Sequence, residues 1–306
     1  MHLLDKVAIQ NKLTLGLVFP LESYAGSVPK MENQEALAQL AEASGFSALW
    51  FRDVPFHDPQ FGDAGQMYDP WVYMAHIMNH TTTIGLATGS IILPLRHPVH
   101  TLKSINSLQL LSKGRITIGI ASGDRPKEYP AFNKVLDNRA ELFRDHFHYL
   151  QQLASDFPKY SSQSYGSAGG SIDVLPKYNS PTPFLVTGHS GQALEWIAKH
   201  GDGWLYYPRN PYMTKHIIED WHNALTATQS QWKPYLQSLY IDLQETDSHE
   251  PAGIHLGFRS GPDFLVSHLQ MLRELGVNHV VINLKYSSRP VEEVIQQLGE
   301  QILSIF

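Results

Sequence analysis

The chain has 306 residues, a formal net charge of −6 and no cysteine, and these values exclude several classes of protein. A chain without cysteine cannot carry a disulfide framework, a thiolate nucleophile or a metal bound by cysteine. No apolar run approaches the roughly 20 residues that a membrane helix needs, and Lys and Arg nowhere cluster as a nucleic-acid partner would require.

The N-terminus, MHLLDKVAIQNK, lacks the basic start, apolar run and small-residue cleavage site of a secretory signal. We therefore expect a cytoplasmic protein that binds neither membranes nor nucleic acid. The chain has 16 histidines, which invites a search for a metal site. Neither His97 with His100 nor His146 with His148 has a persuasive spacing for two ligands on one helix face. We predict no metal site.

Strand-like segments alternate with helix-like segments along the whole chain. The expected strands are residues 13–20, 48–53, 84–93, 115–122, 184–188, 203–207, 236–244 and 279–284. The expected helices are residues 32–44, 70–79, 98–113, 138–157, 192–200, 212–227, 262–275 and 291–305. Such alternation predicts a parallel sheet covered by helices, and eight repeats close it into a (β/α)8 TIM barrel, an α/β fold.

We expect residues 1–306 to form a single barrel domain with loop insertions at the C-terminal face of the barrel. Three long loops, residues 54–68, 160–171 and 245–261, are expected to wall the pocket there. The second is rich in Ser and Gly without apolar periodicity, which predicts a loop or a mobile flap. An open doubly wound sheet is the alternative fold, but the first βα turn, residues 19–22, has no G-x-G-x-x-G motif.

Residues 81–123 have the clearest pattern of strand, loop, helix and strand. In the second strand of this stretch, Ile116, Ile118 and Ile120 alternate with small residues. This alternation predicts that the large side chains face the helices and the small ones face the inside of the barrel.

The same stretch carries a family resemblance. The runs TTTIGLATGSIILPLRHPV and LSKGRITIGIASG resemble the bacterial luciferase-like monooxygenases, which are flavin-using (β/α)8 barrels. True luciferases carry two adjacent histidines where Val54 and Pro55 stand here, so the resemblance implies a non-luminescent member of that family.

In a barrel of this kind the active site lies at the C-terminal ends of the strands. The residues that follow each expected strand are therefore the candidates for chemistry. They are Asp53 and His57, Gly89 and Ser90, Gly123, Asp124 and Arg125, His189, Ser190 and Gly191, Tyr206, Tyr207 and Arg209, and Lys285 and Tyr286.

Gly188 to Gln192 is the clearest candidate for binding a phosphate, because small residues lead from a strand into a helix N-terminus. The resemblance implies that Ser190 and the backbone of Gly191 and Gln192 bind a flavin phosphate, with Arg139 as its charged partner. An ordinary capped helix, and a surface ion pair of Arg139, are the structural alternatives.

Gly89 and Ser90 would let a flat isoalloxazine ring lie close against the backbone. The resemblance implies a cis peptide bond between them, whereas tight packing alone is the alternative. Gly123, Asp124 and Arg125 are expected in the flavin or substrate wall, although Asp124 and Arg125 could equally form an internal ion pair.

Two residues are candidate catalytic groups. Asp53 and His57 follow the second strand and could act as acid, base or hydrogen-bond partner of a substrate. The alternative for His57 is a solvated loop residue.

We predict a flavin-dependent oxidoreductase, most simply a monooxygenase that uses FMN reduced by a separate reductase to act on a small organic substrate. A deazaflavin-dependent enzyme that transfers hydride, a non-catalytic flavin-binding protein and a flavin-free hydrolase are the alternatives. A homodimer is also expected, because the helix at 70–79 carries a broad set of apolar residues: Trp71, Tyr73, Met74, Ile77 and Met78.

Overall fold

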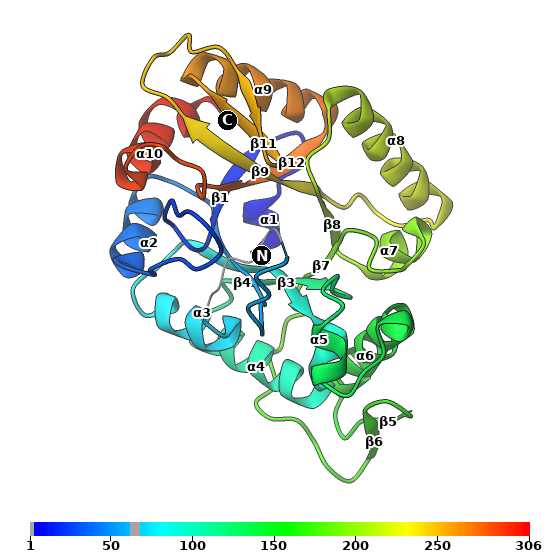
Figure 1. The fold of residues 1–306 in the computed structure, drawn as a ribbon. Helices are drawn as coiled ribbons and strands as arrows, with labels where there is room; N and C mark the ends of the chain where they lie inside the picture. The colour runs from blue at the N-terminus through cyan, green and yellow to red at the C-terminus, as the bar shows by residue number, and fades with distance from the viewer. Residues whose placement is uncertain (1–2, 62–67) are drawn as a thin grey trace.

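The computed structural model describes residues 3–61 and 68–306, and within them eight parallel strands close into a ring (Figure 1). The strands are β1 (Thr14–Val18), β2 (Ala48–Phe51), β3 (Gly85–Ile92), β4 (Ile116–Ala121), β7 (Phe184–Thr187), β8 (Gly203–Tyr206), β9 (Tyr235–Leu243) and β12 (Val277–Asn283). Around the ring their order is β9-β12-β1-β2-β3-β4-β7-β8, and β8 pairs with β9 to close it. The predicted (β/α)8 barrel is confirmed.

Helices cover the outside of the ring (Figure 1). They are α2 (Gln34–Ala43), α3 (Pro70–Met78), α4 (Pro98–Leu111), α6 (Arg139–Leu153), α7 (Leu194–His200), α8 (Pro211–Ala227), α9 (Pro262–Leu275) and α10 (Val291–Gln297). Proline occupies the first turn of α3, α4, α8 and α9, where its missing N–H costs no hydrogen bond. None of the described helices has the length and apolar character that crossing a membrane requires.

Several helix boundaries differ from those expected; α6, for example, ends at Leu153 and not at residue 157. The helix predicted from residue 192 begins at Leu194, because Ser190 and Gly191 have φ angles of 49° and 73° and the chain is still turning there. The closing helix ends at Gln297 as α10, and wider and then tighter turns continue to Ile305.

Apolar residues form two cores on opposite sides of the barrel wall. Ile116, Ile118 and Ile120 of β4 belong to the larger core, between the strands and the helices. Ala121 of the same strand instead lines the pocket at the mouth of the barrel. The expected division between large outward and small inward residues on this strand is therefore confirmed.

The first residues of the chain plug the N-terminal end of the barrel. Leu3 and the short helix α1 (Leu4–Val7) pack with apolar side chains from inside the ring, and Figure 1 shows α1 in the middle of that ring. Thr14 at the start of β1 donates a short hydrogen bond from Oγ1 to the carbonyl oxygen of Val7, which ties the plug to the first strand.

A buried histidine joins the floor of the barrel to this plug. Trp50 Nε1 donates a hydrogen bond to His279 Nε2 at 3.0 Å, and His279 Nδ1 lies 2.7 Å from Thr14 Oγ1. Burial lowers the pKa of His279 to about 3, so the ring is neutral. Because Nε2 accepts, the single ring hydrogen is on Nδ1, and it is donated to Thr14.

The segment at 160–171 was expected to be a loop or a mobile flap, and the structure shows that most of it is a hairpin instead of an irregular loop. It contains most of an antiparallel hairpin, β5 (Lys159–Ser162) and β6 (Gly166–Gly169), beside α6 at the edge of the molecule (Figure 1). Asp145 of α6 accepts hydrogen bonds from Tyr160 Oη at 3.1 Å and Ser162 Oγ at 2.5 Å. These side-chain contacts order a segment whose sequence has no periodicity.

The loop at 245–261 extends the sheet at the barrel mouth. Its strands β10 (Ala252–Ile254) and β11 (Gly257–Ser260) form an antiparallel pair, and β11 runs parallel to the last residues of β9. The remaining long loop, residues 54–68, includes residues 62–67, which lie outside the described residues.

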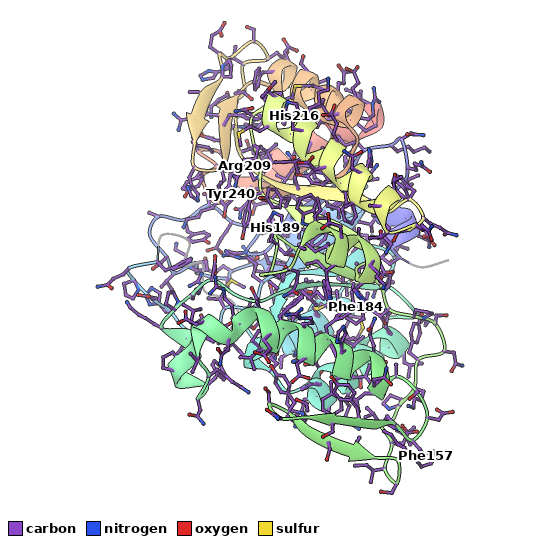
Figure 2. The ribbon with its side chains drawn as sticks, turned by 90° about the vertical axis from the view of Figure 1, so that its right-hand side faces the viewer. Phe157, Phe184, His189, Arg209, His216 and Tyr240 are labelled. Carbon is purple, nitrogen blue, oxygen red and sulfur yellow. The ribbon has the colours of Figure 1, made fainter. Side chains whose placement is uncertain are left out.

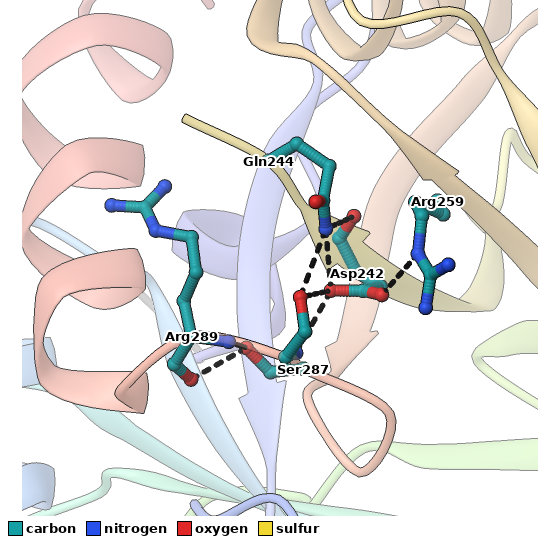
Figure 3. Close-up of polar contacts among 6 residues, drawn as sticks. Asp242, Gln244, Arg259, Ser287 and Arg289 are labelled. Carbon is teal, nitrogen blue, oxygen red and sulfur yellow. Dashed lines mark hydrogen bonds and ion pairs between the residues drawn. The ribbon is translucent and has the colours of Figure 1, made fainter. Parts of the chain in front are cut away.

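A buried carboxylate holds this extension in place (Figure 3). Asp242 of β9 accepts hydrogen bonds from Arg259 Nε at 2.6 Å, Gln244 Nε2 at 2.9 Å, and Ser288 N and Oγ at 2.9 and 2.8 Å. Burial alone would raise the pKa of Asp242, but the bonds from Ser288 and Arg259 outweigh it and lower the pKa. One ionised group thus joins β9, β11 and the loop after β12.

The floor of the barrel yields the first prediction. A Cβ atom added at Gly16 would lie 2.7 Å from His279 Nε2 and from Trp50 Nε1, and 2.8 Å from the carbonyl oxygen of Ala48. We expect Gly16→Ala to lower the free energy of unfolding by roughly 1–3 kcal/mol, measured by chemical denaturation. Gly253→Ala is the control, because nothing lies within 4 Å of its added Cβ. Equal stability of the two variants would contradict this packing.

Candidate active site

A cavity of about 400 Å³ opens at the C-terminal ends of the strands, and we call it the site pocket. This volume is within the usual range for small-molecule sites. Every strand of the ring, or the residues directly after it, contributes to the lining, which includes Val18, Trp50, Asp53, Ser90, Ala121, Gly123, Thr187, Tyr206, Tyr240 and Asn283. Figure 2 shows His189 and Tyr240 near one another on this side of the molecule.

The structure brings nearly all of the predicted site residues together. Those that line the site pocket are Asp53, Gly89, Ser90, Gly123, Asp124, Arg125, Arg139, Gly188, His189, Ser190 and Gly191. His57 is not among the lining residues, and no described lining residue comes from the hairpin at 159–169. From the loop at 245–261, Leu256 lines the site pocket.

One wall of the site pocket is nearly bare backbone. The Gly89–Ser90 peptide bond is cis, as expected. Ser90 Oγ shares a short hydrogen bond with Thr187 Oγ1, which links β3 to β7 across β4. A Cβ atom at Gly89 would lie 3.3 Å from the ring of Trp50, so a side chain here would crowd the floor. The wall therefore offers a flat surface to a planar ligand.

The turn after β7 is pressed against the start of α6. A Cβ atom at Gly191 would lie 2.5 Å from the Cβ atom of Ala140, so only glycine fits at this position. Gln192 Nε2 donates a hydrogen bond to the carbonyl oxygen of Ala140 at 2.9 Å. These contacts place Arg139, the residue before Ala140, beside the turn at 188–191, as the sequence predicted.

Two groups expected to bind a phosphate already have partners within the protein. Ser190 Oγ donates to the carbonyl oxygen of Thr187 at 2.8 Å and accepts from Ser122 N at 3.2 Å. The amide of Gln192 donates to the carbonyl oxygen of His189 at 2.8 Å. The guanidinium of Arg139 has one long hydrogen bond, at 3.3 Å to the carbonyl oxygen of Leu136. Arg139 is therefore the main candidate for holding an anion.

Asp53 lies at the pocket but is held in an ion pair. Arg96 donates from Nε to Oδ2 at 2.8 Å and from Nη2 to Oδ1 at 2.7 Å, and the amide of Ile92 donates to Oδ2 at 3.0 Å. Burial would lower the pKa of Arg96, but Asp53 and Asp69 outweigh it and raise the pKa, so the guanidinium stays charged. This geometry suits a structural clamp better than proton transfer.

His57 lies on the exposed part of the loop after β2. Its Nε2 is 2.7 Å from the hydroxyl oxygen of Ser27, outside the lining of the site pocket. This placement fits the solvated alternative, and a catalytic role for His57 stays a prediction.

Sequence reasoning missed an acidic residue of the site pocket, Glu128. It begins the short helix α5 (Glu128–Ala131) after β4, lines the pocket and is 4% exposed. Burial raises the pKa of its carboxyl group to about 7, and Arg125 partly opposes this shift. No sequence pattern marks this residue, because Glu128 lies in a polar loop and its burial depends on contacts distant in sequence.

The chain is similar to known proteins in sequence and in fold. The family described as luciferase-like monooxygenase matches residues 14–238. An alkanal monooxygenase alpha chain from the Kryptophanaron alfredi symbiont is 28% identical over 193 residues, which are 57% of this chain and 53% of that protein. The chain thus matches about half the length of that curated relative.

Two solved structures have the same fold. An F420-dependent secondary alcohol dehydrogenase, in complex with an F420-acetone adduct, has a TM-score of 0.80 at 16% identity, over 96% of this chain and 99% of that chain. The oxygenating constituent of 3,6-diketocamphane monooxygenase from Pseudomonas putida, in complex with FMN, has a TM-score of 0.75 at 14% identity, over 96% and 98%.

The ion pair of Asp53 gives a prediction on stability. Asp53→Asn leaves the mostly buried Arg96 without its bidentate partner, and we expect a loss of roughly 3 kcal/mol in the free energy of unfolding. Asp69→Asn is the matched control, because Asp69 contacts the same guanidinium at 2.9 Å but is 45% exposed. Asparagine also keeps its role as the cap of α3. Denaturant titration in which both variants lose the same stability would contradict the assignment.

Proposed function

Because the chain belongs to the luciferase-like monooxygenase family and is an oxidoreductase, we propose that it binds FMN in the site pocket. We infer further that it uses the reduced cofactor and oxygen to oxidise a small organic substrate. The observation that carries the proposal is the pairing of a bare, flat wall at Gly89 and Ser90 with a cation, Arg139, beside the turn at 188–191.

The lining of the site pocket fits the two ends of FMN. The planar ring requires a surface without side chains, and the backbone at Gly89 and Ser90 offers one. The phosphate requires a cation in a confined position. Arg139, the first residue of α6, meets that requirement. Bound FMN would supply the redox chemistry, and the protein would orient it and exclude water from it.

The chain's own residues would set the shape of the substrate space. Tyr240 and Leu256, from β9 and the extension held by Asp242, form one side of the mouth. Phe61 and Arg125 form another, with the guanidinium carbon of Arg125 at 4.3 Å from the centre of the Phe61 ring. Together these walls suit a small substrate with apolar parts.

Hydride transfer with a deazaflavin cofactor is the second candidate function. The solved structure with the F420-acetone adduct has the same fold and motivates this alternative. Absorption of the purified protein distinguishes the two cofactors, since oxidised FMN absorbs at longer wavelength than oxidised deazaflavin.

Two partners remain part of the proposal. A separate reductase would supply reduced FMN, because the chain has no dinucleotide-binding motif at its first βα turn. The apolar residues of α3 are a weaker reason to expect a homodimer than the sequence indicated, because Tyr73, Met74 and Ile77 are buried within the chain's own core. Val72 of α3, in contrast, is 67% exposed. The dimer stays a prediction that molecular mass in solution can test.

The proposed phosphate contact predicts a change in affinity. We expect Arg139→Ala to weaken FMN binding about 10-fold to 100-fold, because a hydrogen bond to a charged group contributes roughly 1.5–3 kcal/mol. Quenching of FMN fluorescence measures the dissociation constant. Arg144→Ala serves as the control, since Arg144 is exposed on the same helix. An unchanged dissociation constant in Arg139→Ala would remove this residue from the site.

The tip of β2 predicts the absence of light emission. Val54 and Pro55 stand at the positions of the luciferase histidine pair, and neither side chain can move a proton. We expect negligible light from the protein with reduced FMN, oxygen and a long-chain aldehyde, measured in a luminometer beside an alkanal monooxygenase. Bright emission that depends on the aldehyde would show that another residue replaces the pair.

A further inference from the structure

Glu128 differs from the other buried carboxylates at the barrel mouth in its hydrogen bonding. Both oxygens of Asp53 are bound by Arg96, and both oxygens of Asp242 are bound by neighbouring groups. Glu128 is as deeply buried, at 4% exposed, yet its Oε1 has no hydrogen-bond partner among the described residues. Glu128 is one of the residues that line the site pocket.

A buried oxygen without a partner destabilises a folded protein, whereas the two satisfied carboxylates stabilise it. The contacts of its neighbours hold Glu128 in place. Tyr129 Oη donates a short hydrogen bond to the carbonyl oxygen of Ser122, which folds the segment back on β4. Lys127 Nζ donates to Asp58 Oδ1 at 2.9 Å and to Gln60 Oε1 at 2.7 Å, which joins it to the loop after β2.

The charges that face Glu128 are mixed. Arg125 and a hydrogen bond from the backbone N–H of Phe56 favour the ionised form of its carboxyl group, and Asp53 and Asp124 disfavour it. Burial is the largest influence and favours the neutral form. Glu128 is thus a carboxylic acid that can hold a proton near neutral pH inside the pocket, which is the property required of a general acid.

We propose that Glu128 is the proton-transfer residue of the site pocket, giving its carboxyl proton to an oxygen atom of a bound reactant. The role rests on the proposed function, since the reactant is the substrate or the oxygen that would react with reduced FMN. In the simplest case, bound FMN in its reduced anionic form would supply two electrons and one proton to O2, which would leave oxidised FMN and H2O2. This reaction consumes one proton, which leaves the carboxyl group of Glu128, and the resulting carboxylate regains a proton from water.

The first test needs no cofactor. Glutamate labelled with ¹³C at its carboxyl carbon gives one resonance for each side chain, and the resonance that is missing from Glu128→Gln identifies Glu128. We expect this resonance to titrate with a midpoint near pH 7, whereas exposed glutamates titrate near their usual pKa of about 4.3. A midpoint in that ordinary range would overturn the inference, whether or not FMN binds.

Thermal unfolding as a function of pH checks the same property independently. The folded state holds the proton of Glu128 more tightly than the unfolded state does, so the wild type should lose stability as the pH rises from about 4.5 to about 7. Glu128→Gln should not show this component of the loss. Parallel curves for the two proteins would contradict a raised pKa.

The second test measures proton transfer itself, as reoxidation of reduced FMN bound to the protein after rapid mixing with oxygen. We expect the wild-type rate to fall as the pH rises through about 7, and Glu128→Gln to be at least about 10-fold slower at pH 6, without this pH dependence. Glu128→Asp keeps an acid and should retain a pH-dependent rate. Asp137→Asn, an exposed acid after the same strand, should behave as the wild type.

The outcomes separate the two proposals. A protein that fails to bind FMN refutes the proposed function, and the ¹³C titration still decides the state of Glu128. A Glu128→Gln variant that binds FMN and keeps the wild-type pH profile refutes proton transfer by Glu128 alone. A variant with lower stability but an unchanged profile would show that Glu128 has only a structural role.

Discussion

The pairing of β8 with β9 closes the sheet into a ring, and every other feature of the site depends on that closure. In a closed parallel barrel all C-terminal strand ends meet at one rim, so residues far apart in sequence line a single pocket. The N-terminal plug covers the opposite end through Thr14 and His279. The site pocket opens at the rim that carries the loops.

Three buried carboxyl groups lie at this rim, and they differ in their hydrogen bonding. Asp53 joins the end of β2 to Arg96, and Asp242 joins β9 to β11 and to the loop after β12. Each is satisfied by charged or polar partners, so each supports the shape of the pocket. Glu128 carries an unsatisfied oxygen instead, and such groups are found where a protein gives up stability for function.

The alternation of strands and helices predicted the barrel, because it is a local signal repeated along the chain. The cis bond at Gly89 and the closeness of Arg139 to the turn at 188–191 were implied by the family resemblance. Contacts between residues far apart in sequence could not be predicted. Arg96, 43 residues from Asp53, binds both oxygens of that carboxylate, and a catalytic role for Asp53 stays a prediction. The hairpin at 159–169 forms because Asp145 binds it. No local pattern marks the burial of Glu128.

The central claim is that the bare wall and Arg139 form one cofactor site. A crystal structure of the protein with FMN tests it most directly. We expect the ring against Gly89 and Ser90, and the phosphate within hydrogen-bond distance of the guanidinium of Arg139 and beside the turn at 188–191. FMN bound elsewhere, or with its phosphate away from Arg139, would contradict the account.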